Sequence, residues 1–175
     1  MSFDLHFLNR KPGETWDEAL DALETAAGDA PLTPEDMETW HRLEAHIKTI
    51  LPDVELFSSE DTRELSDEAT GIQLGMYSGQ ISLSVPYWYE GEEADEMTET
   101  LRAVARTVEQ STGLVAFDPQ ANQPFLGGGD AIASQTLEDV HAFVARDIES
   151  GSATAVEAPP QSPAKPSLWR RLFRS

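Results

Sequence analysis

Hydrophobic and polar residues alternate at the start of the chain. Phe3, Leu5 and Phe7 fall on one side of an extended segment, and Asp4 and His6 fall on the other. A period of two with one apolar side is typical of a half-buried β-strand. The pattern therefore predicts a first strand, which ends before the Lys-Pro-Gly turn that follows it.

Two helices are predicted next, because the apolar spacing changes from two to three and four. The first begins at a capping box of Thr15 and Glu18, and Gly28 stands where a left-handed C-terminal cap belongs. The second has Thr33 as its N-cap and Pro34 at its first helical position. The apolar faces consist of Trp16, Leu20 and Leu23 in the first, and of Met37, Trp40, Leu43, Ile47 and Ile50 in the second.

The acidic stretch 53–69 is rich in Ser and Thr, and we expect a short strand around Leu56 followed by a loop. Residues 71–76 and 80–85 each alternate apolar and polar positions on either side of Tyr-Ser-Gly. Alternation on both sides of a short glycine-containing connection predicts a β-hairpin.

A third helix and a further strand complete the regular pattern. Gly113 ends the helix, and 114–117 is a short, wholly apolar strand. The helix has its apolar face at Ala94, Met97, Leu101, Val104 and Val108. The order strand, helical segment, strand, strand, helix, strand predicts an α+β protein with a ferredoxin-like (split βαβ) antiparallel sheet and helices on one face.

The C-terminal third changes in character. A loop over 123–133 precedes a fourth helix, which Thr136 begins and whose apolar face is Leu137, Val140, Val144 and Ile148. We expect a single acidic α+β domain over 1–150, a disordered Pro/Ala/Ser linker over 151–166 and a basic aromatic tail over 167–175.

Charge is distributed unevenly along the 175 residues. The 12 Lys and Arg against 32 Asp and Glu give a formal net charge of −20. Residues 1–164 contain 8 of the basic residues and every acidic one, so they carry −24, while 165–175 carry +4. A field of this sign repels phosphate backbones and argues against nucleic-acid binding. It either steers a basic partner toward the body or serves only to keep the protein in solution.

Asp4 and His6 are the first candidates for chemistry. In the predicted order the first strand pairs with the third, whose matching outward positions are Ser82 and Ser84, so an Asp, a His and two Ser would share the open sheet face. This set resembles a catalytic triad in composition. However, a serine nucleophile requires a strained turn and an oxyanion hole, which a flat strand does not supply. A polar or partner-binding sheet face is the alternative.

Other motifs do not indicate a cofactor or a metal. The chain has no cysteine, and its four histidines are not at ligand spacing. The acids of 90–96 lack the pattern of a calcium loop and suit the start of a helix. Gly127-Gly128-Gly129 is not followed by the Lys of a phosphate-binding loop. The aromatic trio 87–89 covers either a binding site or the core.

Two short motifs resemble a family. The chain opens with Met-Ser-Phe-Asp-Leu, and Gly-Leu-Val-Ala-Phe-Asp-Pro-Gln follows the third helix at 113–120. Both are similar to segments of a widespread group of small uncharacterised bacterial proteins, over roughly 1–120. The resemblance implies an α+β core and a bacterial cytoplasmic setting, but no catalytic residue. The lack of an export signal or a spanning apolar run also leads us to expect a cytoplasmic protein.

We therefore expect a non-enzymatic acidic binding or adaptor protein, comparable in size and charge to toxin-immunity proteins. It would bind a protein partner through its surface and its tail. The tail contact residues would be Trp169, Arg170, Arg171, Leu172, Phe173 and Arg174. Docking on the chain's own body and weak membrane contact are the alternatives for the tail. A small-molecule enzyme at the open sheet face is the alternative function.

Overall fold

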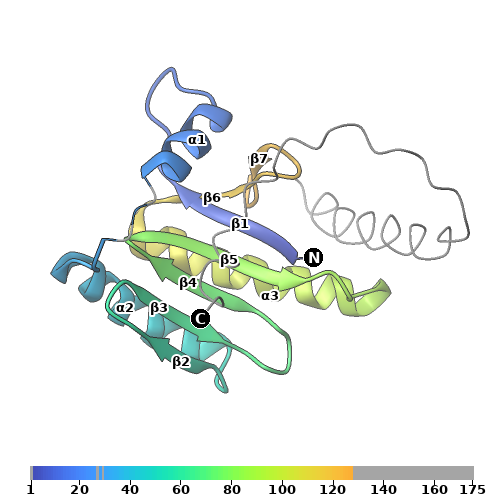
Figure 1. Cartoon of the computed structure of the whole chain (residues 1–175). Helices are drawn as coiled ribbons and strands as arrows, with labels where there is room; N and C mark the ends of the chain where they lie inside the picture. The colour runs from blue at the N-terminus through green and yellow to red at the C-terminus, as the bar shows by residue number, and fades with distance from the viewer. Residues whose placement is uncertain (1, 27, 29, 128–175) are drawn as a thin grey trace, which may run out of the picture.

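The computed structural model describes residues 2–26, 28 and 30–127. These residues form an α+β fold of three helices and one antiparallel sheet of seven strands in the order β2-β3-β4-β5-β1-β6-β7 (Figure 1). The strands are β1 (Ser2–Leu8), β2 (Glu55–Ser58), β3 (Thr62–Ser66), β4 (Gln73–Tyr77), β5 (Gln80–Pro86), β6 (Val115–Asp118) and β7 (Gln123–Pro124). The helices are α1 (Trp16–Ala26), α2 (Pro34–Ile50) and α3 (Gly91–Thr112).

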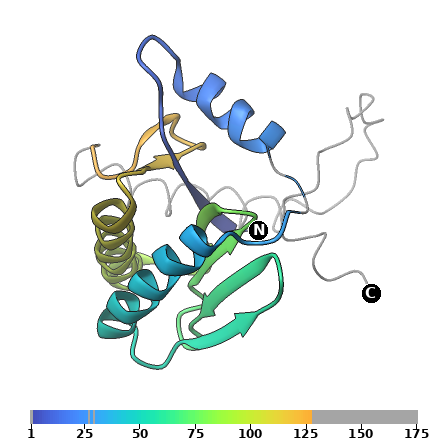
Figure 2. The same cartoon turned by 90° about the vertical axis from the view of Figure 1, so that its left-hand side faces the viewer.

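The main core lies between one face of the sheet and the helices α2 and α3. The odd-numbered residues of β1 are buried there, as the alternation predicts. Trp40, Leu43 and Ile47 reach the core from α2, and the predicted apolar face of α3 is buried as well. Figure 2 shows α2 and α3 side by side on this face of the sheet. The predicted face of α3 is thus buried in full, while Met37 and Ile50 at the two ends of the predicted α2 face are only partly buried.

Helix α1 lies on the opposite face, so the prediction that the helices share one face is wrong for α1. Leu8 and Phe117 belong to a second, smaller apolar cluster with Ala19 of α1. Leu8 has the parity of Asp4 and His6, which is opposite to that of the core residues of β1. Figure 2 shows α1 separated from α2 and α3 by the sheet. The physical reason is that Leu8 and Phe117 form an apolar patch on the otherwise polar face, and α1 covers it.

The stretch 53–69 contains two strands rather than one strand and a loop. β2 was expected near Leu56, but β3 is an additional strand that pairs with both β2 and β4. β3 alternates between Arg63 and Leu65 on one side and Thr62, Glu64 and Ser66 on the other. Leu65 is its single apolar residue, so the sequence pattern did not predict this strand. The meander β2-β3-β4-β5 is therefore two strands longer than the hairpin that the sequence predicts.

The turns and helix ends follow local chemistry, with two exceptions. Ser78 and Gly79 join β4 to β5 and both have positive φ, as in the hairpin turns that match strand twist. Gly113 is a left-handed cap, with φ of 73°. Gly28 does not have the expected left-handed φ, and a short strand, β7, replaces the first part of the loop expected from residue 123.

Several sequence predictions fall outside the described residues. These are the fourth helix over 136–148, the linker 151–166 and the tail 167–175. None of the three described helices is long and apolar enough to cross a membrane.

Candidate functional site

The register brings the four predicted residues together in two cross-strand pairs. Asp4 lies opposite Ser84, and His6 lies opposite Ser82, in the antiparallel pair of β1 and β5. Directly opposite residues of an antiparallel pair project from the same face. Asp4, His6, Ser82 and Ser84 therefore share one face of the sheet, and a catalytic role for them stays a prediction.

The same face continues without interruption toward the β2 edge. Ser82 is opposite Gly75, Gly75 is opposite Glu64, and Glu64 is opposite Phe57. We call the outward positions of β2 to β5, together with Asp4 and His6, the open sheet face. The viewer of Figure 1 looks onto this face, with α2 and α3 behind the strands.

Asp4 is a partly buried carboxylate with nearby hydroxyl donors. The Ser2 hydroxyl donates to both of its oxygens, at 3.1 and 3.0 Å. Burial raises the pKa of Asp4, and hydrogen bonds from Ser2 and Ser84 and the charge of His6 oppose that rise. The carboxylate is thus held by hydroxyl groups in a setting that has lost part of its water.

Burial lowers the pKa of His6, and the negative charges of Asp4 and Glu24 oppose the change. No hydrogen bond between described residues joins His6 to Ser82 or Ser84. Activation of a serine nucleophile requires such a bond to a base. The face therefore places the components of a triad next to one another without the contact that would link them.

Glu64 is a member of this face that the sequence analysis missed. It lies in the stretch that was expected to be a loop, so its position on a strand was not anticipated. Burial raises the pKa of the Glu64 carboxyl. The alternation of Thr62, Glu64 and Ser66 with Arg63 and Leu65 was the signal that could have placed it on the sheet.

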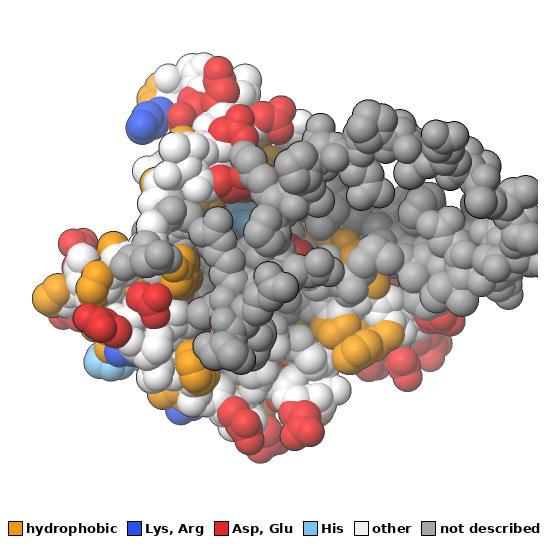
Figure 3. All heavy atoms as spheres, viewed as in Figure 1, with side chains coloured by type: hydrophobic (Ala, Val, Ile, Leu, Met, Phe, Trp, Pro, Cys, Tyr) orange, Lys and Arg blue, Asp and Glu red, His pale blue; other side chains and the backbone are white. Residues whose placement is uncertain are grey.

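Basic side chains are missing from the open sheet face. The outward strand positions that the structure describes include no Lys or Arg, while Asp4, Glu55 and Glu64 supply three carboxylates. On the parts of this view not covered by grey atoms, Figure 3 shows Asp and Glu at several places and Lys and Arg at few. Arg63 is nearby, but its guanidinium donates to the carbonyls of Ser59 and Thr62.

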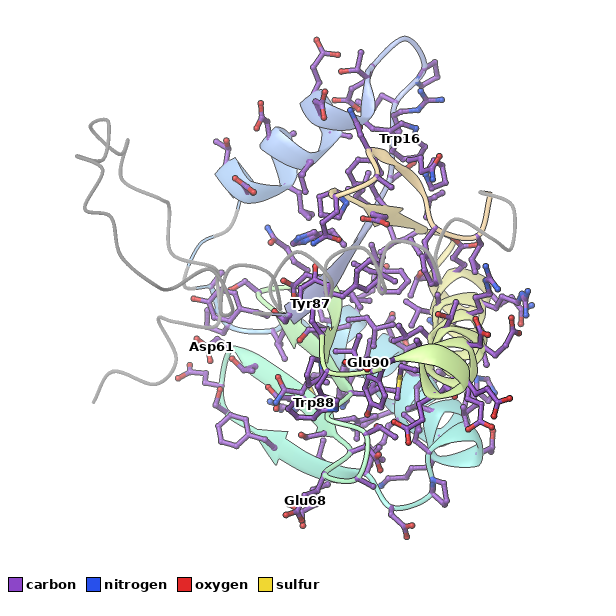
Figure 4. All side chains as sticks on the ribbon, turned by 90° about the vertical axis from the view of Figure 1, so that its right-hand side faces the viewer. Trp16, Asp61, Glu68, Tyr87, Trp88 and Glu90 are labelled. Atoms are coloured by element: carbon purple, nitrogen blue, oxygen red, sulfur yellow. The ribbon has the colours of Figure 1, made fainter. Side chains whose placement is uncertain are left out.

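Exposed apolar side chains lie on the face and at its edges. Phe57, an outward residue of the edge strand β2, is 56% exposed, and Trp88 is 63% exposed. Leu56 lies on the opposite side of β2 and is 47% exposed. Figure 4 shows Trp88 beyond the end of β5, with Asp61 and Glu68 at opposite ends of β3. The border of the face thus combines apolar rings with carboxylates.

The aromatic trio 87–89 does not act as one unit. Tyr87 packs edge-on against Phe3, and the Tyr89 hydroxyl donates to the Thr70 carbonyl at 2.6 Å. Burial and the charges of Asp4 and Asp118 raise the pKa of Tyr87 to about 12. Tyr87 and Tyr89 therefore cover the core, while Trp88 remains available for contacts.

The Asp-Pro-Gln motif that carried the family resemblance has a local structural role. The Oδ1 atom of Asp118 accepts from the backbone N–H groups of Gln120 and Ala121, at 2.8 and 3.1 Å. This arrangement stabilises the turn between β6 and β7. Burial raises the pKa of Asp118, and these two hydrogen bonds oppose the rise.

A separate groove of about 470 Å³ lies between α2 and α3, far from the open sheet face. It is lined by Arg42, His46, Thr49, Ile50, Thr107, Gln110 and Ser111. Thr49 and Thr107 already donate their hydroxyl protons to backbone carbonyls of their own helices. Among the described residues, no three His, Asp or Glu side chains are grouped so that they could hold a metal ion.

The tail residues 169–174 and the motif 128–130 lie outside the described residues, so their predicted roles stay predictions. Comparison of the chain with protein-family models, curated proteins and solved structures finds no match.

Proposed function

We propose that this protein is a non-enzymatic acidic binding module whose open sheet face receives a basic segment of a protein partner. The observation that carries the proposal is the composition of that face. It is a continuous strand surface with three carboxylates, the exposed ring of Phe57 and no described Lys or Arg, and the exposed ring of Trp88 lies next to it. Carboxylates attract a cationic segment, and the exposed rings provide apolar area for its contact.

Electrostatics favours a cationic partner over other classes. The acidic body accelerates association with a basic protein and repels nucleic acid and anionic membranes. A small protein that neutralises a basic toxin would need these properties, so we retain an immunity-like role within the proposal. Catalysis at Asp4, His6, Ser82 and Ser84 has less support, because His6 has no hydrogen bond to either serine within the described residues.

We also infer a ferredoxin-like core. The spatial order β4-β5-β1-β6, with α3 between β5 and β6 in the chain, supports this description. In this reading β2 and β3 extend one edge of a split βαβ sheet, and β7 extends the other.

The experiment is a titration of the full chain with a fluorescent peptide that alternates Arg and Trp. Replacing Glu55 and Glu64 by Lys should weaken binding by about tenfold or more, since each lost charge contact contributes about 1 kcal/mol. The matched control replaces Glu38 of α2 and Glu96 of α3 by Lys, which changes the net charge equally on exposed helix positions. Equal weakening by both double variants would show that the net charge, and not this face, binds the peptide.

A further inference from the structure

The carboxylates of the open sheet face have no cationic partner among the described residues. They include Glu64, whose pKa burial raises, and Asp4, which accepts hydrogen bonds from the Ser2 hydroxyl. Neither residue has an ion pair with a described Lys or Arg. A partly buried carboxylate is stabilised strongly by an Arg, because the guanidinium supplies both a charge and paired donors.

The chain carries a segment of matching chemistry. Its last eleven residues contain four basic and no acidic side chains. Four large apolar residues, Leu168, Trp169, Leu172 and Phe173, are interspersed there with Arg170, Arg171 and Arg174. A segment of this composition complements a face that offers carboxylates next to the exposed rings of Phe57 and Trp88.

We infer that residues 167–174 of this chain bind to its own open sheet face. The inference rests on the proposed function, since it uses the same face and the same ligand chemistry. The arginines contact the carboxylates of Glu55, Glu64 and Asp4, and the apolar side chains contact Phe57 and Trp88. The tail then occupies the face as a basic partner would, and a partner has to displace it.

The connecting segment is long enough for this contact. The described part ends at Gly127 beyond β7, at the sheet edge opposite β2. Seven strands span about 29 Å, from six spacings of about 4.8 Å. Residues 128–166 number 39, and even at the helical rise of about 1.5 Å per residue a stretch of this length exceeds that distance. A tether that can span the sheet places the tail near the face at an effective concentration in the millimolar range.

The absence of cysteine allows a direct test on the full chain. Ser175→Cys introduces the only thiol of the chain, so a spin label attaches at this position alone. The label reports where the end of the tail lies. We expect selective loss of amide signals from Phe57, Glu64 and Ser82, with α2 and α3 unaffected. A control sample mixes spin-labelled chains that contain no ¹⁵N with ¹⁵N-labelled chains that carry no spin label. The amide signals should be retained in this mixture, because the contact is within one molecule.

Matched variants separate a specific contact from general attraction. Glu64→Gln should restore part of the lost signal, whereas Glu38→Gln on α2 should restore none. Retained signals over the whole sheet would overturn the inference, and so would broadening in the mixed sample, which would assign the tail to a second copy. Broadening that appears only when anionic vesicles are added would assign it to a membrane and also overturn the inference.

A second measurement distinguishes this inference from the proposed function. Replacing Arg170, Arg171 and Arg174 by Glu should strengthen binding of the Arg/Trp peptide, because a docked tail reduces the fraction of free faces. If spin-label broadening occurs but no variant binds the peptide, the proposed function fails and the tail contact stands. If the peptide binds without any broadening, only the tail contact fails.

Discussion

Gly71 shows how a single residue governs the approach of two segments next to the open sheet face. It precedes β4 with φ of +66°, and its N–H donates to the Asp67 carbonyl at 2.7 Å. A Cβ atom built at this position would lie 2.7 Å from Cγ of Pro86 and 3.3 Å from the ring of Trp88. The position therefore combines a left-handed backbone with close contact to a rigid ring.

Gly71→Ala should lower the free energy of unfolding more than Gly13→Ala does. Gly13 also has positive φ, of +86°, but its added Cβ would meet nothing within 4 Å. We expect a cost of about 1 kcal/mol at Gly13 from backbone strain and about 2–4 kcal/mol at Gly71, where overpacking adds to it. Urea denaturation of both variants measures the difference, and equal losses would contradict the steric explanation.

His6 should make stability depend on pH. Burial lowers its pKa in the folded state, so below the usual His value of 6.5 the unfolded chain binds more protons than the folded chain. The stability contribution of His6 is therefore lost as the pH falls from about 6.5 toward the folded pKa. Asp4 and Glu24 face this imidazole and limit the effect.

As the pH falls from about 7.5 to 5, the free energy of unfolding should therefore decrease less in His6→Gln than in the native chain. Chemical denaturation at several pH values gives the slope of the free energy of unfolding against pH for each protein. Ser82→Ala removes the hydroxyl group opposite His6 and no titrating group, so this variant should keep the native slope. A His6→Gln slope as steep as the native one would assign the pH dependence to other groups.

Among the elements, α1 differs from α2 and α3 in how it is held. Its Trp16 stacks on Phe117 with centroids 5.4 Å apart, and Ala19 is its one buried residue. Side-chain hydrogen bonds from Gln80 to the Leu23 carbonyl and from Ser78 to the Gly28 carbonyl add to this contact. A helix with so small a buried face opens more readily than α2 and α3, which contribute to the main core.

Trp16→Ala should destabilise α1 locally by about 2–3 kcal/mol, the usual loss for a large partly buried side chain. Amide hydrogen exchange should accelerate over Trp16–Ala26 and change little in α2. Arg10→Ala is the matched control, because it removes only the guanidinium that lies 4.6 Å from the Trp16 ring, which contributes about 0.5–1 kcal/mol. Equal acceleration in α1 and α2 would show that α1 unfolds only with the whole domain.

For the whole molecule, repulsion between carboxylates opposes folding. The formal charge is −20, and two ion pairs join residues of the described part, Lys48–Glu44 and Arg102–Glu99. Each is an i,i+4 or i,i+3 pair within one helix, so neither connects separate elements. Such pairs contribute about 0.3–0.5 kcal/mol and cannot offset the repulsion of the acidic body.

Sodium chloride should therefore raise the melting temperature. Between about 0.01 M and 1 M salt the Debye length falls from about 30 Å to about 3 Å, which screens the repulsion between distant carboxylates. Thermal unfolding followed by circular dichroism measures the change. A neutral osmolyte series separates it from general effects of cosolutes, and a melting temperature that falls with salt would mean that attractive pairs dominate.

Part of the candidate site was visible in the sequence because it depends on strand period and on one pairing. The alternation of β1 and β5 put Asp4, His6, Ser82 and Ser84 on the outward side, and the pairing of the first and third predicted strands made them neighbours. Glu64 was not predicted, because β3 lies in an acidic stretch with a weak apolar signal. Its strand forms through backbone pairing with two neighbours, which is a nonlocal interaction.

The sequence by itself determined the elements whose signals are local: the capped helix α2, the hairpin with its Ser-Gly turn, the apolar face of α3 and the segregation of charge. These follow from backbone conformation and side-chain spacing over a few residues. Only the tertiary structure decided that α1 covers the opposite face and that β2 and β3 widen the sheet. Both outcomes depend on apolar surface and unpaired strand edges that exist only once the sheet has assembled, and the local pattern of β3 is too weak to predict its pairing.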